Sequence, residues 1–168
     1  MIEYKPISPG DIAQFWTFLN QLDSETYFMM YEPEERSRRT TLPQLQREIQ
    51  NSVIDGEDFI HIALEGGNIV GFLHAERGKF NRIRHTAYIV TGVLKSHRGQ
   101  GIGAALFEQL DQWAKESGII RLELTVECNN RAAKHLYEKR GFTVEGTRKS
   151  SMCVNGQYTD EYYMAKIL

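Results

Sequence analysis

The sequence predicts an α/β fold in which one mixed, mostly antiparallel sheet of about seven strands carries helices on both faces. Three observations lead to this prediction. The 168 residues suit one domain, which we expect to cover residues 1–168. Segments with strand-like alternation are interleaved with segments of helical periodicity. Two tight turn signals join neighbouring strand-like segments directly, which antiparallel strands allow and parallel strands do not.

The first 58 residues predict one strand and two helices. Ile2–Lys5 is strand-like and ends at a proline-containing stretch. Asp11 is placed to cap the first helix. The apolar residues of this helix follow helical spacing at Ile12, Phe15, Trp16, Leu19 and Leu22. A second helix is expected to begin near Thr41, because T-L-P-Q has the spacing of a capping box.

The middle of the chain predicts three strands. Phe59–Leu64 and Ile69–Ala75 flank the sequence Glu65-Gly66-Gly67-Asn68, which is typical of a β-hairpin turn. Thr86–Leu94 is rich in β-branched and aromatic residues. These segments therefore supply a hairpin and a neighbouring strand.

The last third predicts two helices and three strands. Ile102, Leu106, Leu110 and Trp113 mark one face of a helix that ends near Gly118. The strand Arg121–Glu127 follows. Asn130 is placed to cap the next helix, and Gly141 has the position of a residue just beyond a helix C-terminus. Two late strands, near Phe142–Val154 and Tyr158–Ile167, surround the turn Asn155-Gly156.

Composition and charge narrow the function classes. Lys+Arg 20 against Asp+Glu 22 gives a net charge of −2, which argues against a general nucleic-acid or membrane-surface binder. Two cysteines are too few for a disulfide framework and suit a reducing compartment. The N-terminal stretch MIEYKPISPGDIAQ has charges where a signal peptide needs an apolar core. We therefore expect a cytoplasmic protein with no nucleic-acid or membrane partner.

The stretch HRGQGIGAAL, residues 97–106, is the first candidate site. A Walker A loop is excluded because no Lys-Ser/Thr follows the glycines. A dinucleotide fingerprint fits the glycine spacing, but the charged spacer of residues 95–98 separates the glycines from their strand. The third interpretation is R-x-x-G-x-G at a helix start, where outward N–H groups and the helix dipole would bind a pyrophosphate. From the glycines alone, a tight turn that binds nothing is an equally good interpretation.

A second motif decides between these alternatives. Residues 129–142 read N-N-R-A-A-K-H-L-Y-E-K-R-G-F. This motif and R-x-x-G-x-G after a strand ending at Val93 together resemble the GCN5-related N-acetyltransferase family. The matching positions of the second motif are Asn130, Ala133, Leu136, Tyr137, Gly141 and Phe142. The resemblance covers residues 83–168, and the tail from Gly146 is similar to that of ribosomal-protein, polyamine and phosphinothricin acetyltransferases.

The resemblance implies an acetyl-CoA site. Backbone N–H groups at the glycine turn would hold the pyrophosphate, and main-chain groups of Val93 and Lys95 would bond pantetheine like an added strand. The residues implied at the turn are Arg98, Gly99, Gly101, Gly103 and Ala104. Asn130 would contact the CoA arm, although a helix cap alone also explains it. A residue larger than glycine at position 101 would then block the approach of the cofactor without unfolding the chain.

Tyr137 is the candidate general acid, since the family commonly places a tyrosine near the CoA sulfur. A phenol there can supply a proton to the departing thiolate. The alternative is a buried aromatic residue, because Ala133, Leu136 and Tyr137 share one helix face. Cys128 is expected to be a small buried residue rather than a nucleophile, since nothing around it would activate a thiol.

No general base is implied by the resemblance. The position where ribosomal alanine acetyltransferases carry a glutamate is Thr125, and the position used by histone acetyltransferases falls at Ala87-Tyr88. Glu76 and His85 form one hypothetical pair across a turn, either as a proton acceptor or as a structural cross-strand pair. The loop Glu25–Glu32 is aromatic, Met-rich and acidic, as an amine pocket would be, and about half of it is expected to lie in the core.

The sequence therefore predicts an acetyl-CoA-dependent N-acetyltransferase that acts by direct transfer in a ternary complex, without a metal. The amine acceptor is left open between a small molecule and a protein amine. A non-catalytic acyl-CoA sensor is the alternative. A homodimer is a further possibility, since members of the family often form one.

Overall fold

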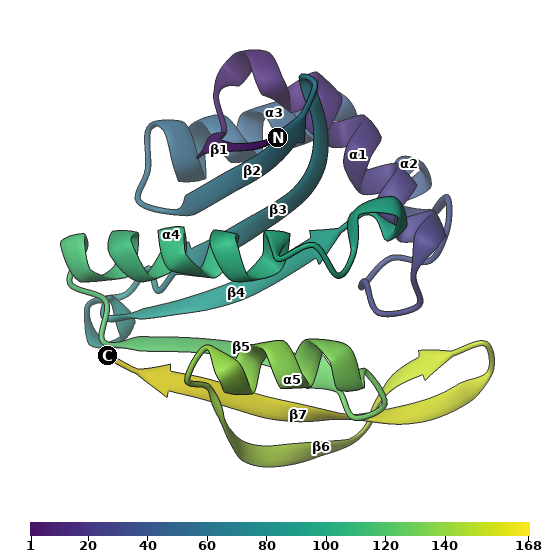
Figure 1. Ribbon diagram of the computed structural model, residues 1–168, viewed down its shortest axis with the longest axis vertical. Coiled ribbons are helices and arrows are strands. Elements are labelled where there is room, and N and C mark those ends of the chain that lie inside the picture. Colours follow the sequence, from purple (N-terminus) through teal and green to yellow (C-terminus); the bar gives the residue numbers. More distant parts are fainter.

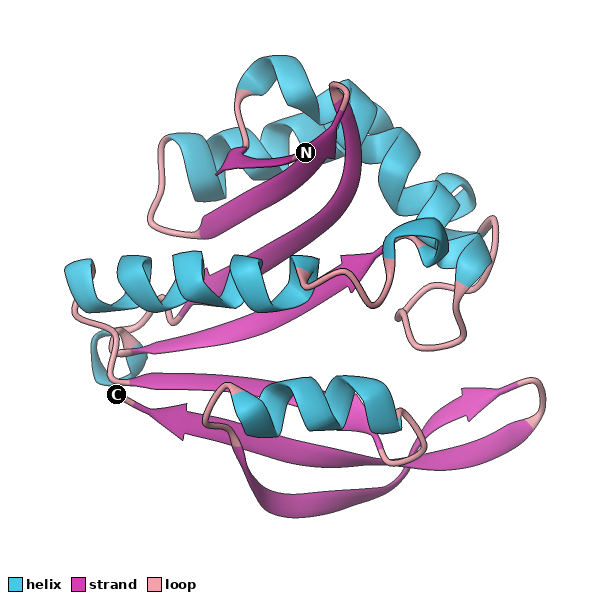
Figure 2. Cartoon of the chain, viewed as in Figure 1, coloured by secondary structure: helices cyan, strands magenta, loops and turns pink.

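The computed structural model describes residues 1–168 and contains one seven-stranded sheet between helices (Figures 1 and 2). The strands are β1 Ile2–Pro6, β2 Phe59–Glu65, β3 Asn68–Arg77, β4 Thr86–Val93, β5 Arg121–Glu127, β6 Thr143–Val154 and β7 Gln157–Ile167. Their order in the sheet is β1-β2-β3-β4-β5-β7-β6, and only β4 and β5 pair in parallel. The predicted mixed, mostly antiparallel α/β fold is confirmed.

Five α-helices complete the fold: α1 Ile12–Glu25, α2 Glu35–Arg39, α3 Leu42–Ile49, α4 Ile102–Glu116 and α5 Arg131–Lys139. Short turns of other helical types are η1 Pro9–Asp11, η2 Gln50–Ile54, η3 Asn81–Ile83 and η4 Lys95–His97. No helix combines the length and the apolar content that a membrane crossing needs.

The helix starts agree with the sequence at α3 and α5 and differ at α1. Thr41 caps α3 by accepting from Gln44 N–H at 3.3 Å, as its capping box predicts. Asp11 stands at the N-cap position of α1, as predicted, but its side chain makes no capping hydrogen bond to the helix, because a 3₁₀ turn at Pro9–Asp11 precedes it. The Asp11 carboxylate accepts from Ser8 N–H at 2.9 Å and from Lys5 Nζ instead, so it fixes the turn before the helix.

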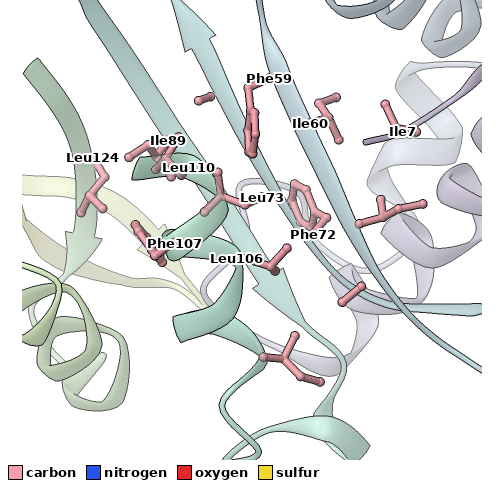
Figure 3. Packing of buried hydrophobic residues seen from close by; sticks show 14 of the residues in the cluster. Ile7, Phe59, Ile60, Phe72, Leu73, Ile89, Leu106, Phe107, Leu110 and Leu124 are labelled. Carbon is pink, nitrogen blue, oxygen red and sulfur yellow. The ribbon is translucent and has the colours of Figure 1, made fainter. Parts of the chain in front are cut away.

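The two faces of the sheet are covered by different helices. Phe72 and Leu73 are neighbours on β3 and therefore point to opposite faces (Figure 3). The Phe72 ring packs edge-on against Phe15 of α1, with centroids 5.4 Å apart. On the other face, a Cβ at Gly71 would lie 3.1 Å from Ile102 of α4. Thus α1 and α3 cover one face of β1–β4, and α4 covers the other.

The sheet opens between its two central strands. β4 and β5 pair only through Thr86–Tyr88 and Arg121–Glu123, and their C-terminal halves diverge (Figure 1). Beyond this point β4 pairs only with β3, and β5 pairs only with β7. We call the opening between Ile89–Val93 and Leu124–Glu127 the β4–β5 wedge. It exposes the edges of two strands in the middle of the sheet, where a ligand can pair with them.

Candidate active site at the β4–β5 wedge

Backbone groups of β4 point into the wedge. Leu94 N–H donates to Val70 C=O on β3 at 2.9 Å. Because alternate residues of an antiparallel strand direct their N–H and C=O to the same side, those of Thr91 and Val93 point away from β3 and toward β5. β5 does not pair with them there. The wedge therefore offers main-chain donors and acceptors to an extended ligand.

The glycine turn after β4 presents a row of unused donors. The backbone N–H groups of residues 99–104 donate to no acceptor in the chain, whereas Ala105 N–H donates to Gly101 C=O at 3.1 Å. Gly99 and Gly101 have φ of +73° and +81°, and no atom lies within 4 Å of a Cβ built on either residue. The row continues into the first turn of α4, where the helix dipole adds positive potential. This arrangement suits a pyrophosphate.

The positive φ of Gly101 corrects one expectation. A residue with a Cβ is strained in this conformation, by about 1–2 kcal/mol. A valine at position 101 would therefore affect the stability of the turn as well as the approach of a ligand. Gly103 has a different role, because a Cβ there would lie 2.9 Å from Leu136 Cδ2. Because glycine has no Cβ, α4 can pack closely against α5 at this position.

Two of the main-chain groups expected to bind pantetheine have partners within the chain. Lys95 N–H donates to Glu25 Oε1 at 2.8 Å, and Arg98 Nε donates to Val93 C=O at 3.3 Å. Burial opposes ionisation of Glu25, but the hydrogen bonds from Lys95 and Gln21 outweigh it and hold the pKa of Glu25 below its ordinary value. A ligand that uses these two backbone groups has to replace both side chains.

Tyr137 lies on the α5 side of the wedge. It is 9% exposed, and its ring packs against Phe107 and Phe142, with centroids 5.6 Å and 6.2 Å away. Burial, together with the nearby Tyr88 phenol, raises the pKa of Tyr137 to about 12. No hydrogen bond within the chain engages its hydroxyl. The phenol is therefore neutral at physiological pH and its proton is free for another acceptor.

Asn130 caps α5, since its side-chain oxygen accepts from Ala133 N–H at 3.3 Å. The cap predicted from the sequence is confirmed. Cys128 is only partly buried, so the expectation of a buried thiol is wrong in degree.

Three features of the site region lie beyond what the sequence indicated. Tyr88 Oη and Thr125 Oγ1 lie 2.8 Å apart on the sheet face opposite α4 and α5. Glu127 is 5% exposed at the end of β5, and its Oε2 has no hydrogen-bond partner. Burial raises the pKa of Glu127, against the hydrogen bond from Thr159. Strand alternation predicts that Tyr88, Thr125 and Glu127 lie on the sheet face opposite Tyr137, but it does not predict their contacts.

Two further hypotheses are wrong. Glu76 and His85 do not stand opposite each other, because the register of β3 and β4 pairs Glu76 with Tyr88 and leaves His85 before β4. Glu76 lies 3.9 Å from Lys79 instead. The loop of residues 25–32 contains no fully buried residue, and Tyr27, Phe28 and Met30 are exposed. Tyr27, Phe28 and Met30 are therefore available to a ligand, whereas Met29 packs partly against the core.

Comparisons with known proteins agree with this geometry. The family model described as Acetyltransferase (GNAT) family matches residues 16–142. An L-amino acid N-acetyltransferase of Escherichia coli is 34% identical over 110 residues, which are 63% of this chain and 66% of that protein. An acetyltransferase of the GNAT family from Streptococcus pneumoniae is 28% identical, with a TM-score of 0.93 over 100% of this chain and 99% of that one.

A putative acetyltransferase from Salmonella typhimurium, solved with its cofactor acetyl-CoA, shares the fold at 20% identity. Its TM-score is 0.87 over 100% of this chain and 94% of that chain. With the family match extending over most of the sequence, this chain belongs to the GNAT acetyltransferase family.

Proposed function

We propose that this protein transfers an acetyl group from acetyl-CoA to a primary amine by direct attack within a ternary complex. The observation that carries the proposal is the row of unpartnered N–H groups at residues 99–104, beside an open wedge in the sheet. Acetyl-CoA supplies the acetyl group as an activated thioester. The chain supplies binding, orientation and proton transfer.

Different residues bind different parts of acetyl-CoA. The N–H groups of residues 99–104 hold the pyrophosphate, with Arg98 at the entrance of the turn. The main-chain groups of Thr91 and Val93 orient the pantetheine arm along β4. Lys95 N–H joins them when Glu25 gives up its bond, and Asn130 adds a contact from the start of α5.

Two groups serve the chemistry. The Val93 N–H stabilises negative charge that develops on the carbonyl oxygen under attack. Tyr137 donates its proton to the departing thiolate. Its hydroxyl makes no hydrogen bond within the chain, which supports this role, since its proton is available to the thiolate.

The acceptor is a primary amine. The relative named an L-amino acid N-acetyltransferase supports amino acids as the first candidates among small amines. The test is a coupled assay of CoA release from acetyl-CoA, with L-amino acids, spermidine and a peptide N-terminus as acceptors. We expect CoA release that depends on one class of amine. Tight acetyl-CoA binding without CoA release from any amine would overturn transfer and favour a sensor.

A further inference from the structure

A groove lies between the α1–α3 layer and the sheet. Its volume is about 380 Å³, and it is lined by α1, α3, η2 and strands β2 to β4. Phe15, Leu19 and Phe72 belong to its apolar floor. We call it the α1–β3 groove. It lies on the sheet face opposite α4 and α5, and therefore opposite the face that carries Tyr137.

The groove reaches the edge of the wedge. Val90 lines it from β4, which is one of the two strands that diverge. At the other side, Met29 brings in the exposed loop that follows α1. An acceptor with an apolar body in the groove would therefore have its reactive end over β4.

The charges around the groove favour a cation. Three carboxylates line it, from Glu48, Asp58 and Glu76. Of the two basic residues, Arg36 is committed to the fully buried Asp23 through bonds of 2.7 Å and 3.1 Å. Lys79 alone offsets the carboxylates. This excess of negative charge suits an ammonium group and disfavours an anion.

His74 lies on β3 and lines this groove. Its Nε2 is buried, lies 3.6 Å from Asp58 Oδ2 and has no hydrogen-bond partner. Asp58 is held in place because its Oδ1 accepts from Arg77 N–H at 3.0 Å. The His74 side chain is 32% exposed and lines the groove. With Nε2 turned to Asp58, Nδ1 is the nitrogen left for a groove ligand.

His74 is also close to the wedge. The register pairs it directly with Val90. Adjacent strands lie about 4.8 Å apart. One strand width therefore separates His74 from Val90, and Val93, whose N–H is proposed to face the acetyl oxygen, lies three residues or about 10 Å farther along β4.

We propose that the α1–β3 groove binds the acceptor, a primary amine with an apolar body, and that His74, beside Asp58, takes the proton of the acceptor ammonium. This inference rests on the proposed acetyl transfer. The ammonium N–H bond breaks and its proton goes to His74 Nδ1. The free amine then forms the C–N bond as the C–S bond breaks, and the thiolate takes the Tyr137 proton. The second proton of the attacking nitrogen passes through solvent to the Tyr137 phenolate, so the products are a neutral amide, the CoA thiol and protonated His74.

The test of binding uses 2-phenylethylamine as the cation and 3-phenylpropanoate as the anion of similar shape. Calorimetric titration without cofactor should detect the amine and not the anion. Ser52→Trp places a large side chain in the groove and should weaken amine binding at least tenfold, with acetyl-CoA affinity unchanged. Equal affinity for both probes, or no effect of Ser52→Trp, would overturn the assignment of the groove.

The test of proton transfer compares His74→Gln with His85→Gln, which alters an exposed histidine before β4. We expect His74→Gln to lower kcat/KM for 2-phenylethylamine by about 10²–10⁴-fold near pH 7. The loss should shrink as pH rises, because the free amine is then present without a base. The charged groups lining the groove around His74 are Asp58, Glu76, Glu48, Arg36 and Lys79. Because Asp58 lies nearest to His74 Nε2, Asp58→Asn should give the same pH pattern with a smaller loss.

These outcomes distinguish a failure of the His74 role from a failure of the proposed acetyl transfer. A loss that is the same at every pH, or is matched by His85→Gln, would overturn the role of His74. Failure of the wild-type protein to bind acetyl-CoA would refute the proposed function, while the amine titration still decides whether the groove is a cation site.

Discussion

Replacing Tyr137 with phenylalanine removes one oxygen atom and leaves the buried ring between Phe107 and Phe142. The hydroxyl has no hydrogen-bond partner in the chain, so no bond worth about 0.5–1.5 kcal/mol is lost. The free energy of unfolding should therefore change by less than about 1 kcal/mol, which is a shift of about 2–4 °C or less in Tm for a chain of this size. Removing the ring as well, in Tyr137→Ala, should cost about 3–5 kcal/mol.

Tyr137→Phe should lower the catalytic rate strongly although it changes stability little. Loss of a positioned acid lowers kcat by about 10²–10⁴-fold, which corresponds to about 2.7–5.5 kcal/mol of transition-state stabilisation. Because burial raises the pKa of Tyr137 to about 12, the wild-type phenol stays protonated through pH 9, and the loss should be uniform across that range. The assay is single-turnover CoA release, with thermal melting as the folding control. Near-normal single-turnover rates in a stable Tyr137→Phe protein would refute the acid role and leave Tyr137 as core.

Three other changes test the fold around the site. Asp23→Asn breaks the buried pair with Arg36 and should cost about 3–5 kcal/mol in urea unfolding; a cost below about 1 kcal/mol would contradict the buried-pair assignment. Gly92→Val places a Cβ 2.5 Å from Leu22 Cδ2, so we expect a loss of about 1–3 kcal/mol by the same method, and wild-type stability would show that α1 lies farther from β4. Burial raises the pKa of Glu127, so the folded state holds its proton more tightly and stability falls as pH rises above 4.5 toward the folded pKa. Glu127→Gln should therefore be more stable than wild type at pH 7 and lose that advantage below pH 4.5. If the difference in Tm between the variant and wild type were the same at both pH values, ionisation of Glu127 would not be the cause of the pH-dependent stability.

Local signals in the sequence were sufficient for most elements of the fold. The Thr41 capping box, the Gly66-Gly67 turn and the Asn130 cap each depend on residues a few positions apart, and each has the predicted role. Helix α2 was missed because Glu35–Arg39 contains no apolar residue. Its Arg36 side chain bonds Asp23 of α1, and such a long-range ion pair leaves no periodic signal in the sequence.

The site was predictable only where a motif carries it. The glycine turn follows from its residues, since the positive φ of Gly99 and Gly101 is a local property of the chain. The occupation of Lys95 N–H by Glu25 joins residues 70 positions apart, and no pattern in the sequence indicates it. The Asp58–His74 contact likewise depends on the register of β2 and β3. The sequence suggested Glu76 and His85 because they are close along the chain, but they are not strand partners.

The proposed function depends on pyrophosphate binding by the unpartnered N–H groups at the start of α4, and Ala104→Pro tests this binding most directly. Proline removes one donor of the row, and the Ala104 N–H makes no hydrogen bond in the chain. The first turn of a helix tolerates proline, and Gly103 before it has no Cβ to clash with the ring. Ala104→Ser retains the N–H group and is the matched control. In calorimetric titration with acetyl-CoA, we predict that Ala104→Pro binds about 10–150-fold more weakly than Ala104→Ser, as expected for one hydrogen bond to a charged group worth about 1.5–3 kcal/mol. Equal affinity of the two folded variants would contradict the claim that these N–H groups bind the pyrophosphate.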